Sequence, residues 1–324
     1  MRILAGDIGG TKTDLALYDG TTIVARKRYP SRDYPSLTAV ALEFLGTITI
    51  DAAAFAVAGP VRDGRCKATN LPWEMDEVTL KGALRAPVTL LNDLAAVIFG
   101  IPELDPQADL VVLHEGEREA QGPIAVVAAG TGLGEAIGVP TARGLRVLPS
   151  EGGHTDLAPR NEVEIALLRF MYTRHPARVS SERVLSGPGL IAIYDFVVAQ
   201  GLATPKPETR AEMSTTDPAA VIGRLGSSGE DPACERALSL FVSLYGSEAG
   251  NLALKVLPTG GLYIGGGIAP KILERLRRGD FLQALQTKGR MSDVLQTIPV
   301  SVVTSKDVAV IGAHAAAKIA FAAT

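Results

Sequence analysis

Residues 6–13 read Gly6-Asp7-Ile8-Gly9-Gly10-Thr11-Lys12-Thr13 and lie between two short apolar runs, 2–5 (RILA) and 14–18 (DLALY). Glycines in a turn between strands let the backbone approach phosphate oxygens closely and direct N–H groups toward them. An acidic residue at the end of the first strand can hold Mg²⁺ through water. The segment therefore indicates a phosphate-binding β-hairpin, although a plain glycine-rich hairpin is an equal alternative for this motif alone.

Two other phosphate motifs fit this segment less well. A Walker loop requires GxxxxGK[ST], and Thr11 stands where its second glycine should be. A Rossmann fingerprint opens a helix, whereas an alternating strand pattern follows here. The residues that we expect to contact phosphate are Gly6, Asp7, Ile8, Gly9, Gly10 and Thr11, with Asp7 also holding Mg²⁺.

The opening of the chain has the pattern of an α/β layer. Short apolar or alternating runs separated by turn residues predict strands, and apolar residues at spacings of three and four predict a helix. The expected strands are 2–5, 14–18, 22–28, 53–61 and 87–93, with a helix over 36–47.

The pattern then restarts, which suggests a duplicated α/β core. Residues 108–116 and 123–140 give further strands around a second glycine turn, Gly130-Thr131-Gly132. Helices are expected over 162–172, 180–201 and 235–257, and residues 201–235 read as a connection around a short helix. A strand over 260–267 ends in Gly265, Gly266 and Gly267, and a final strand and helix occupy 298–321.

Composition excludes several classes of protein. The 324 residues are 47% hydrophobic and 21% charged, which predicts a compact protein of two domains or one large one. Lys and Arg total 32 against 35 Asp and Glu, so no basic surplus favours nucleic acid. Cys66 and Cys234 lack zinc-ligand spacing. No signal-peptide core and no run of ~20 apolar residues occurs, so we expect no membrane association and a cytoplasmic protein.

Three glycine turns at strand ends suggest one bound nucleotide. In this chain order the turns resemble the phosphate and adenosine motifs of the sugar kinase, actin and heat-shock ATPase superfamily. Four further segments resemble the bacterial ATP-dependent glucokinase family. They are LLNDLAAVIFGIPEL (90–104), PSEGGHTDLAP (149–159), SSERVLSGPGL (180–190) and FVSLYGSEAGNLAL (241–254).

The pair Asn92-Asp93 ends the strand expected over 87–93, so the carboxylate should project from the sheet edge. A carboxylate there can take the proton from a sugar hydroxyl as that hydroxyl attacks the γ-phosphorus. By pattern alone, an Asn-Asp pair at a strand end is more often a turn or a helix cap. In the resembling family the catalytic aspartate matches Asp93, and a sugar-binding asparagine matches Asn92.

Glu151 and His154 flank two glycines, so a carboxylate and an imidazole can each bond to a sugar hydroxyl. By pattern alone His154 is more often an ordinary loop histidine, and Glu182 an ordinary acid in a first helical turn. The resemblance implies that Glu151, His154 and Glu182 contact the sugar. It implies the same for Thr69 and Asn70, whose loop is harder to align.

One residue departs from the family pattern. Lys12 stands where a close group of these kinases has Asn, and it can add positive charge near the phosphates without an assigned catalytic role. Repressor and kinase relatives with GGTK carry a Cys-rich zinc motif after the histidine. This chain has no cysteine between Cys66 and Cys234.

The resemblance implies a two-domain actin-like (ribonuclease H-like) α/β fold with a cleft between its domains. We expect a small domain over 1–103 plus 304–324 and a large domain over 104–303. The implied substrates are D-glucose and ATP with Mg²⁺, giving glucose 6-phosphate and ADP, and the implied assembly is a homodimer.

Three alternatives remain open. A kinase for another hexose, such as mannose or fructose, would phosphorylate that sugar rather than glucose in a substrate panel. A non-catalytic sugar sensor of this fold would carry a DNA-binding module, for which we expect no room before the first strand. An actin-like filament former would have no need of the EGGH sequence at 151–154.

Overall fold

A computed structural model of the protein describes residues 1–68, 71–142 and 144–322. The chain forms two compact units, of which the first comprises Met1–Asp109, Ala136–Pro149 and Ser305–Thr324. The second comprises Leu110–Glu135 and Ser150–Thr304. The domain boundaries expected from the sequence stay a prediction, and these units differ from them chiefly by residues 136–149.

The first unit is built on a sheet with the strand order β3-β2-β1-β4-β7. The first three strands form an antiparallel meander, and β4 and β7 run parallel to β1. These strands are β1 (Arg2–Ile8), β2 (Lys12–Asp19), β3 (Thr22–Pro30), β4 (Ala52–Val57) and β7 (Val88–Asn92). The meander predicted from the first three apolar runs is confirmed.

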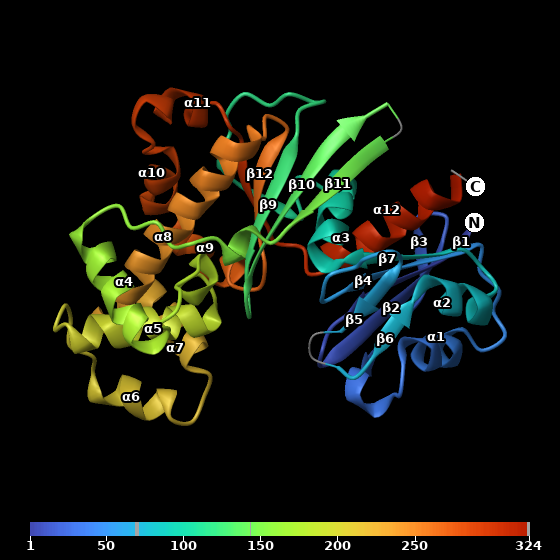
Figure 1. The fold of residues 1–324 in the computed structure, drawn as a ribbon, viewed down its shortest axis with the longest axis horizontal. Helices are drawn as coiled ribbons and strands as arrows, with labels where there is room; N and C mark the ends of the chain where they lie inside the picture. Colours follow the sequence, from blue (N-terminus) through green and yellow to red (C-terminus); the bar gives the residue numbers. More distant parts are fainter. Residues whose placement is uncertain (69–70, 143, 323–324) are drawn as a thin grey trace. The chain divides into compact units, whose positions relative to one another are not determined.

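Helices cover both faces of this sheet, as Figure 1 shows. Alternate strand residues such as Leu4 and Phe55 pack with α1 (Leu37–Leu45) and α2 (Glu77–Leu84). The intervening residues, such as Ala5 and Ala54, pack against α12 (Val308–Ala322). Helix α3 (Asp93–Gly100) packs against α12. Because side chains alternate along a strand, strands buried on both faces read as continuous apolar runs.

The second sheet has the strand order β11-β10-β9-β12-β13-β8. Strands β12 and β13 follow β9 in parallel, as β4 and β7 follow β1, and β8 adds an antiparallel edge. The strands are β8 (Leu110–His114), β9 (Ile124–Ala129), β10 (Leu133–Thr141), β11 (Gly144–Ser150), β12 (Gly261–Gly265) and β13 (Val300–Val303). The repeated order confirms the duplicated core expected from the sequence.

Helix α8 (Pro232–Val256) organises the core of the second unit and is buried along most of its length. It begins at Pro232 because the Asp231 side chain accepts a hydrogen bond from the Cys234 backbone N–H at 2.9 Å. Around it pack α5 (Gly187–Ala199), α7 (Pro218–Ser228) and α10 (Asp280–Gln286).

Shorter elements complete the two units. The remaining strands and helices are β5 (Arg65–Lys67), β6 (Glu74–Asp76), α4 (Glu162–Arg174), α6 (Pro207–Met213), α9 (Leu273–Leu276) and α11 (Ser292–Gln296). Single 3-10 turns occur at Ser31–Asp33, Ile101–Glu103, Gly152–His154, Ser181–Arg183, Ala269–Ile272 and Gly289–Met291. Within the described residues, no helix has the length and apolar character needed to cross a membrane.

The sequence pattern missed α2, α3 and β11, and it was wrong in two further regions. Residues 201–235, expected to hold one short helix, contain α6 and α7, each beginning at a proline. The short helices and turns between β12 and β13 were not predicted. Segments of four to seven residues are too short to show a helical period, so tertiary packing decides them: α10 and α11 pack against α8, and α9 packs against α10.

Candidate active site

The first glycine turn joins β1 and β2 and has a tightly fixed backbone. Gly9 N–H donates to the Lys12 carbonyl at 2.9 Å, and the Ser31 hydroxyl donates to the Gly9 carbonyl at 2.8 Å. A Cβ at Gly6 would lie 2.7 Å from Leu15 Cδ2, so a larger residue there would require the core side chains to shift. Ser31 gave no signal in the sequence, because its role depends on the tertiary contact with Gly9.

Asp7 and Asp93 lie at the carboxyl ends of β1 and β7, which run in the same direction on either side of β4. Burial, together with the charges of Asp93 and Asp14, raises the pKa of Asp7 to about 6. Lys12 and Arg28 oppose this change. The carboxylates at this sheet edge therefore repel one another, and a divalent cation bound there would reduce that repulsion.

Asp14 stays ionised beside them because two arginines pair with it. Arg26 and Arg28 approach its Oδ2 atom at 2.9 and 2.6 Å. Although burial acts in the opposite direction, these hydrogen bonds lower the pKa of Asp14. Arg26 also pairs with Asp307 at 2.6 Å, just before α12. This network was not predicted from the sequence.

Asn92 and Asp93 open helix α3. The Asn92 Oδ1 atom accepts from the backbone N–H groups of Leu94 at 3.0 Å and Ala95 at 3.4 Å, and its Nδ2 atom donates to the Gly59 carbonyl at 3.2 Å. Asn92 is therefore the helix cap, the structural alternative that the sequence left open, and one amide N–H remains for a ligand. Asp93 is partly exposed at the first helical position, where a negative charge is favoured.

Thr69 and Asn70, the loop residues expected to contact the sugar, lie outside the described residues. The nearby Trp73 is buried, and its Nε1 atom donates to the Tyr34 carbonyl at 3.0 Å.

In the second unit, the other two glycine turns come together. Gly130 follows β9, and its carbonyl accepts from Gly187 N–H at 2.8 Å. Gly266 follows β12 with a φ of 82°, and a Cβ there would lie 2.3 Å from the Ala129 carbonyl oxygen. Ile268 N–H donates to the same Ala129 carbonyl at 3.2 Å. The geometry places the turns at Gly130–Gly132 and Gly265–Gly267 side by side.

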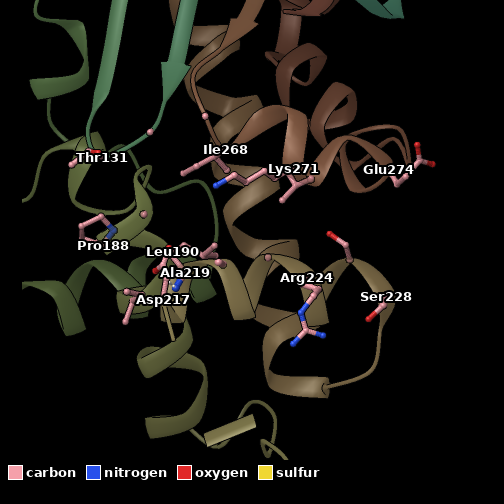
Figure 2. A pocket seen from close by; sticks show the side chains of 18 residues that line it. Thr131, Pro188, Leu190, Asp217, Ala219, Arg224, Ser228, Ile268, Lys271 and Glu274 are labelled. Atoms are coloured by element: carbon pink, nitrogen blue, oxygen red, sulfur yellow. Dashed lines mark hydrogen bonds between the residues drawn. The ribbon is translucent and has the colours of Figure 1, made fainter. Parts of the chain in front are cut away.

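A pocket of ≈ 880 Å³ opens beside these two turns. Its size is that of a small-molecule site. Three of its lining residues, Gly130, Thr131 and Gly267, were expected to bind a nucleotide. Figure 2 shows other residues that the sequence analysis did not single out, which are Pro188, Leu190, Asp217, Ala219, Arg224, Ser228, Ile268, Lys271 and Glu274. They come from α5, from α7 and the residue before it, and from the segment after β12 that runs through the 3-10 turn into α9. Their separation in sequence left no local signal for the pocket.

Glu151 and His154 bound a single 3-10 turn in the second unit. His154 N–H donates to the Glu151 carbonyl at 2.9 Å, and both side chains are exposed. A Cβ at Gly153 would lie 1.9 Å from the Leu133 carbonyl oxygen, so the turn packs directly on the start of β10. The Arg178 guanidinium donates to the His154 carbonyl. The turn is thus fixed while its two polar side chains face outward.

Glu182 lies next to the same start of β10. Its Oε2 atom accepts from Leu133 N–H at 3.0 Å, and a Cβ at Gly132 would lie 2.5 Å from that oxygen. The structure therefore brings Glu182, the Glu151–His154 turn and the second glycine turn together around Leu133. Within the described residues, no group of three or more His, Cys, Asp or Glu side chains is arranged to hold a metal ion.

Comparisons with known proteins agree with one another. The family model described as glucokinase matches residues 4–320. The chain is 44% identical to a glucokinase of Nostoc sp. over 96% of this chain and 97% of that protein, and 41% identical to one of Synechocystis sp. over 97% of each.

Solved structures extend this similarity to the fold. A glucokinase from an Antarctic psychrotroph is 36% identical, with a TM-score of 0.86 over 98% of each chain. A ROK family glucokinase from Streptomyces griseus, solved with glucose and AMPPNP, has a TM-score of 0.65 over 98% of this chain and 99% of that one. At 19% identity it shows a shared fold. These neighbours have the two-domain actin-like fold expected from the sequence.

Proposed function

The chain belongs to the glucokinase family, and on that premise we propose that it transfers the γ-phosphoryl group of ATP to the 6-hydroxyl of D-glucose. The observation that carries the proposal is the whole-chain family match, together with a structure that holds a carboxylate, Asp93, at a sheet edge beside Asp7. The products are glucose 6-phosphate and ADP.

Asp93 is the catalytic base in this proposal. Its carboxylate accepts the proton of the 6-hydroxyl while that oxygen forms a bond to the γ-phosphorus and the bond to the leaving ADP oxygen breaks. Asn92, Glu151, His154 and Glu182 hold the other sugar hydroxyls. The exposure of Glu151 and His154 on a fixed turn supports this role, since a positioned group loses little entropy on binding. Thr69 and Asn70 remain proposed sugar contacts.

The nucleotide occupies the pocket beside Gly130, Thr131 and Gly267 in this proposal. The apolar surfaces of Leu190 and Ile268 suit a purine ring, and the backbone N–H groups of the turns suit phosphate. Gly6, Ile8, Gly9, Gly10 and Thr11 of the first unit, with Gly132, Gly265 and Gly266, complete the proposed phosphate contacts.

Mg²⁺ fits the acidic edge of the first sheet. Asp7 has a raised pKa because it is buried near Asp93 and Asp14, and cation binding there would favour the charged form. We propose that Asp7 holds Mg²⁺ through water. When bound, Mg²⁺ neutralises phosphate charge. We also propose that the protein is cytoplasmic and forms a homodimer, as the family resemblance implies. Light scattering of the purified chain tests the homodimer.

The test is ADP release with MgATP, sugar by sugar, for glucose, mannose, fructose, N-acetylglucosamine and no sugar. We expect strong turnover with glucose. Asp93→Asn should lower kcat by at least ~100-fold, the low end of general-base effects, with glucose affinity largely intact. Asp195→Asn is the matched control, because that carboxylate only pairs with Arg174 on the surface.

Each contrary outcome has a distinct meaning. Near wild-type turnover in Asp93→Asn would remove Asp93 as the base. Turnover with another hexose but not glucose would make the chain a different sugar kinase. Glucose binding without turnover would favour a sugar sensor.

A further inference from the structure

Two carboxyl groups are buried together behind the Glu151–His154 turn. Glu135 on β10 is 2% exposed and Glu248 on α8 is 5% exposed. They lie within hydrogen-bonding reach of each other. Among the described residues, neither Oε1 atom has a hydrogen-bond partner. Two ionised carboxylates in this position would be costly, whereas one proton shared between them satisfies both.

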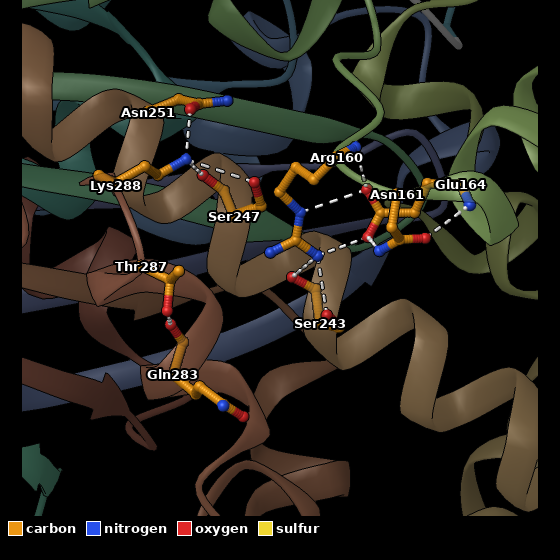
Figure 3. Close-up of polar contacts among 9 residues, drawn as sticks. All are labelled: Arg160, Asn161, Glu164, Ser243, Ser247, Asn251, Gln283, Thr287 and Lys288. Atoms are coloured by element: carbon orange, nitrogen blue, oxygen red, sulfur yellow. Dashed lines mark hydrogen bonds and ion pairs between the residues drawn. The ribbon is translucent and has the colours of Figure 1, made fainter.

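The surrounding contacts leave the proton on Glu135. The Glu248 Oε2 atom accepts hydrogen bonds from Asn251 Nδ2 at 3.0 Å and from Ser181 Oγ at 3.4 Å. Figure 3 shows that Lys288 Nζ donates to the Asn251 Oδ1 atom at 2.6 Å. Because an ammonium group can only donate, this contact fixes the orientation of the Asn251 amide, and its Nδ2 atom is the one that donates to Glu248. Burial, and then the charge of Glu248, raise the pKa of Glu135 to about 7.

The pair contacts both elements that carry the proposed sugar ligands of the second unit. A Cβ at Gly152 would lie 1.8 Å from the Glu135 Oε2 atom, so this carboxyl packs directly against the backbone between Glu151 and His154. Glu248 bonds to Ser181, the residue before Glu182. A shift of either carboxyl is therefore transmitted to the turn or to Glu182.

We propose that Glu135 and Glu248, joined by one proton, are positioning residues that hold the Glu151–His154 turn and Glu182 in the arrangement that binds glucose. This inference rests on the proposed function. Loss of the proton places two like charges in contact. Their repulsion separates the two carboxyls, and the movement of Glu135 displaces the Glu151–His154 turn through its contact with Gly152. The expected consequence is a higher KM for glucose with little change in the KM for MgATP.

Other charged or titratable groups surround the pair. Those that interact with the pair are Tyr245 and Lys255 on α8 and Lys288 beyond it. Glu151, His154 and Glu182 lie on the two segments that the pair contacts. Lys255 opposes the effect of Glu248 on Glu135. The test must therefore isolate Glu135 from the other groups that titrate nearby.

The experiment compares the pH dependence of the glucose KM in the wild type, in Glu135→Gln and in Glu235→Gln, an exposed control on α8, the helix that carries Glu248. If only the protonated pair binds glucose well, the apparent KM rises as the protonated fraction falls. With a pKa near 7, the wild-type KM should rise about tenfold from pH 7 to pH 8.3. Glutamine keeps the shape and a permanent donor toward Glu248, so its KM should stay flat and lie about twofold below the wild type at pH 7.

Further measurements separate the outcomes. Glu248→Gln also removes the second charge, so it should flatten the profile even where Glu135→Gln fails to fold. The KM for MgATP should follow the same course in all variants. Equal pH profiles in the wild type and both glutamine variants, or a flat wild-type profile, would overturn the inference and leave the kinase assignment standing. Absence of both glucose turnover and calorimetric glucose binding in the wild type would overturn both.

Discussion

Tyr245 joins the two nucleotide turns of the second unit, and its hydroxyl can be removed without changing the ring. The residue is fully buried on α8. Its hydroxyl accepts from Ala129 N–H at 3.2 Å and lies 3.1 Å from the Val127 carbonyl and 3.3 Å from the Gly265 carbonyl. These groups end β9 and β12, immediately before the two glycine turns. Tyr245→Phe therefore removes a hydrogen-bonded bridge between the strands.

The expected loss follows from the groups left without partners. A net hydrogen bond is worth ~1 kcal/mol, and a buried N–H left unsatisfied costs a further ~1–3 kcal/mol. The aromatic contacts with Phe241 and Phe281 stay in Tyr245→Phe. We expect the free energy of unfolding to fall by about 2–3 kcal/mol. If about 1 kcal/mol of this loss falls on the turns, affinity for MgATP drops about fivefold.

Urea unfolding followed by circular dichroism measures the first quantity, and nucleotide titration measures the second. Tyr263→Phe is the control, because within the part of the chain that the structure describes its hydroxyl accepts only from the Arg118 side chain, at 3.2 Å, and bonds to no backbone group. A loss of stability in Tyr245→Phe no greater than in Tyr263→Phe would refute the bridging role. Unchanged MgATP affinity with the full loss of stability would limit that role to the core.

Two further predictions concern the proposed site. His154→Ala should raise the glucose KM about 3–10-fold, the worth of one hydrogen bond, with little loss of stability because the side chain is exposed; an unchanged KM would make it an ordinary loop histidine. Asp7→Asn should abolish MgATP-dependent turnover yet raise the free energy of unfolding by about 3 kcal/mol at pH 7 and by little at pH 4. The reason is that folding raises the Asp7 pKa to about 6. Between pH ~4 and ~6 Asp7 therefore ionises in the unfolded chain before it ionises in the folded protein, so wild-type stability falls as pH rises through this range. Urea unfolding at both pH values checks the sign, and an equal gain at both would contradict it.

The local pattern of the chain determined the framework of both units. Glycine-rich turns between short apolar runs are sufficient to predict the β1-β2 hairpin and its counterpart at Gly130, because turn conformation and strand alternation are set by neighbouring residues. The repeat of that pattern predicted the duplicated sheet, and motif resemblance predicted the family. Nothing in the spacing of residues predicted α6 and α7 as two helices, because weak local preferences there are settled by packing of α7 against α8 and of α6 against α7.

Tertiary structure decided what the individual polar groups do. By pattern alone Asn92 is more often a turn or cap residue than a ligand, and only the position of Gly59 and the start of α3 shows that it caps the helix. Glu135 and Glu248 are ordinary acids in sequence, and only their shared burial and the charge of Glu248 raise the pKa of Glu135 to about 7. Desolvation and charge pairing depend on groups that are distant along the chain, so a carboxyl acquires its chemistry only when the fold brings its neighbours to it.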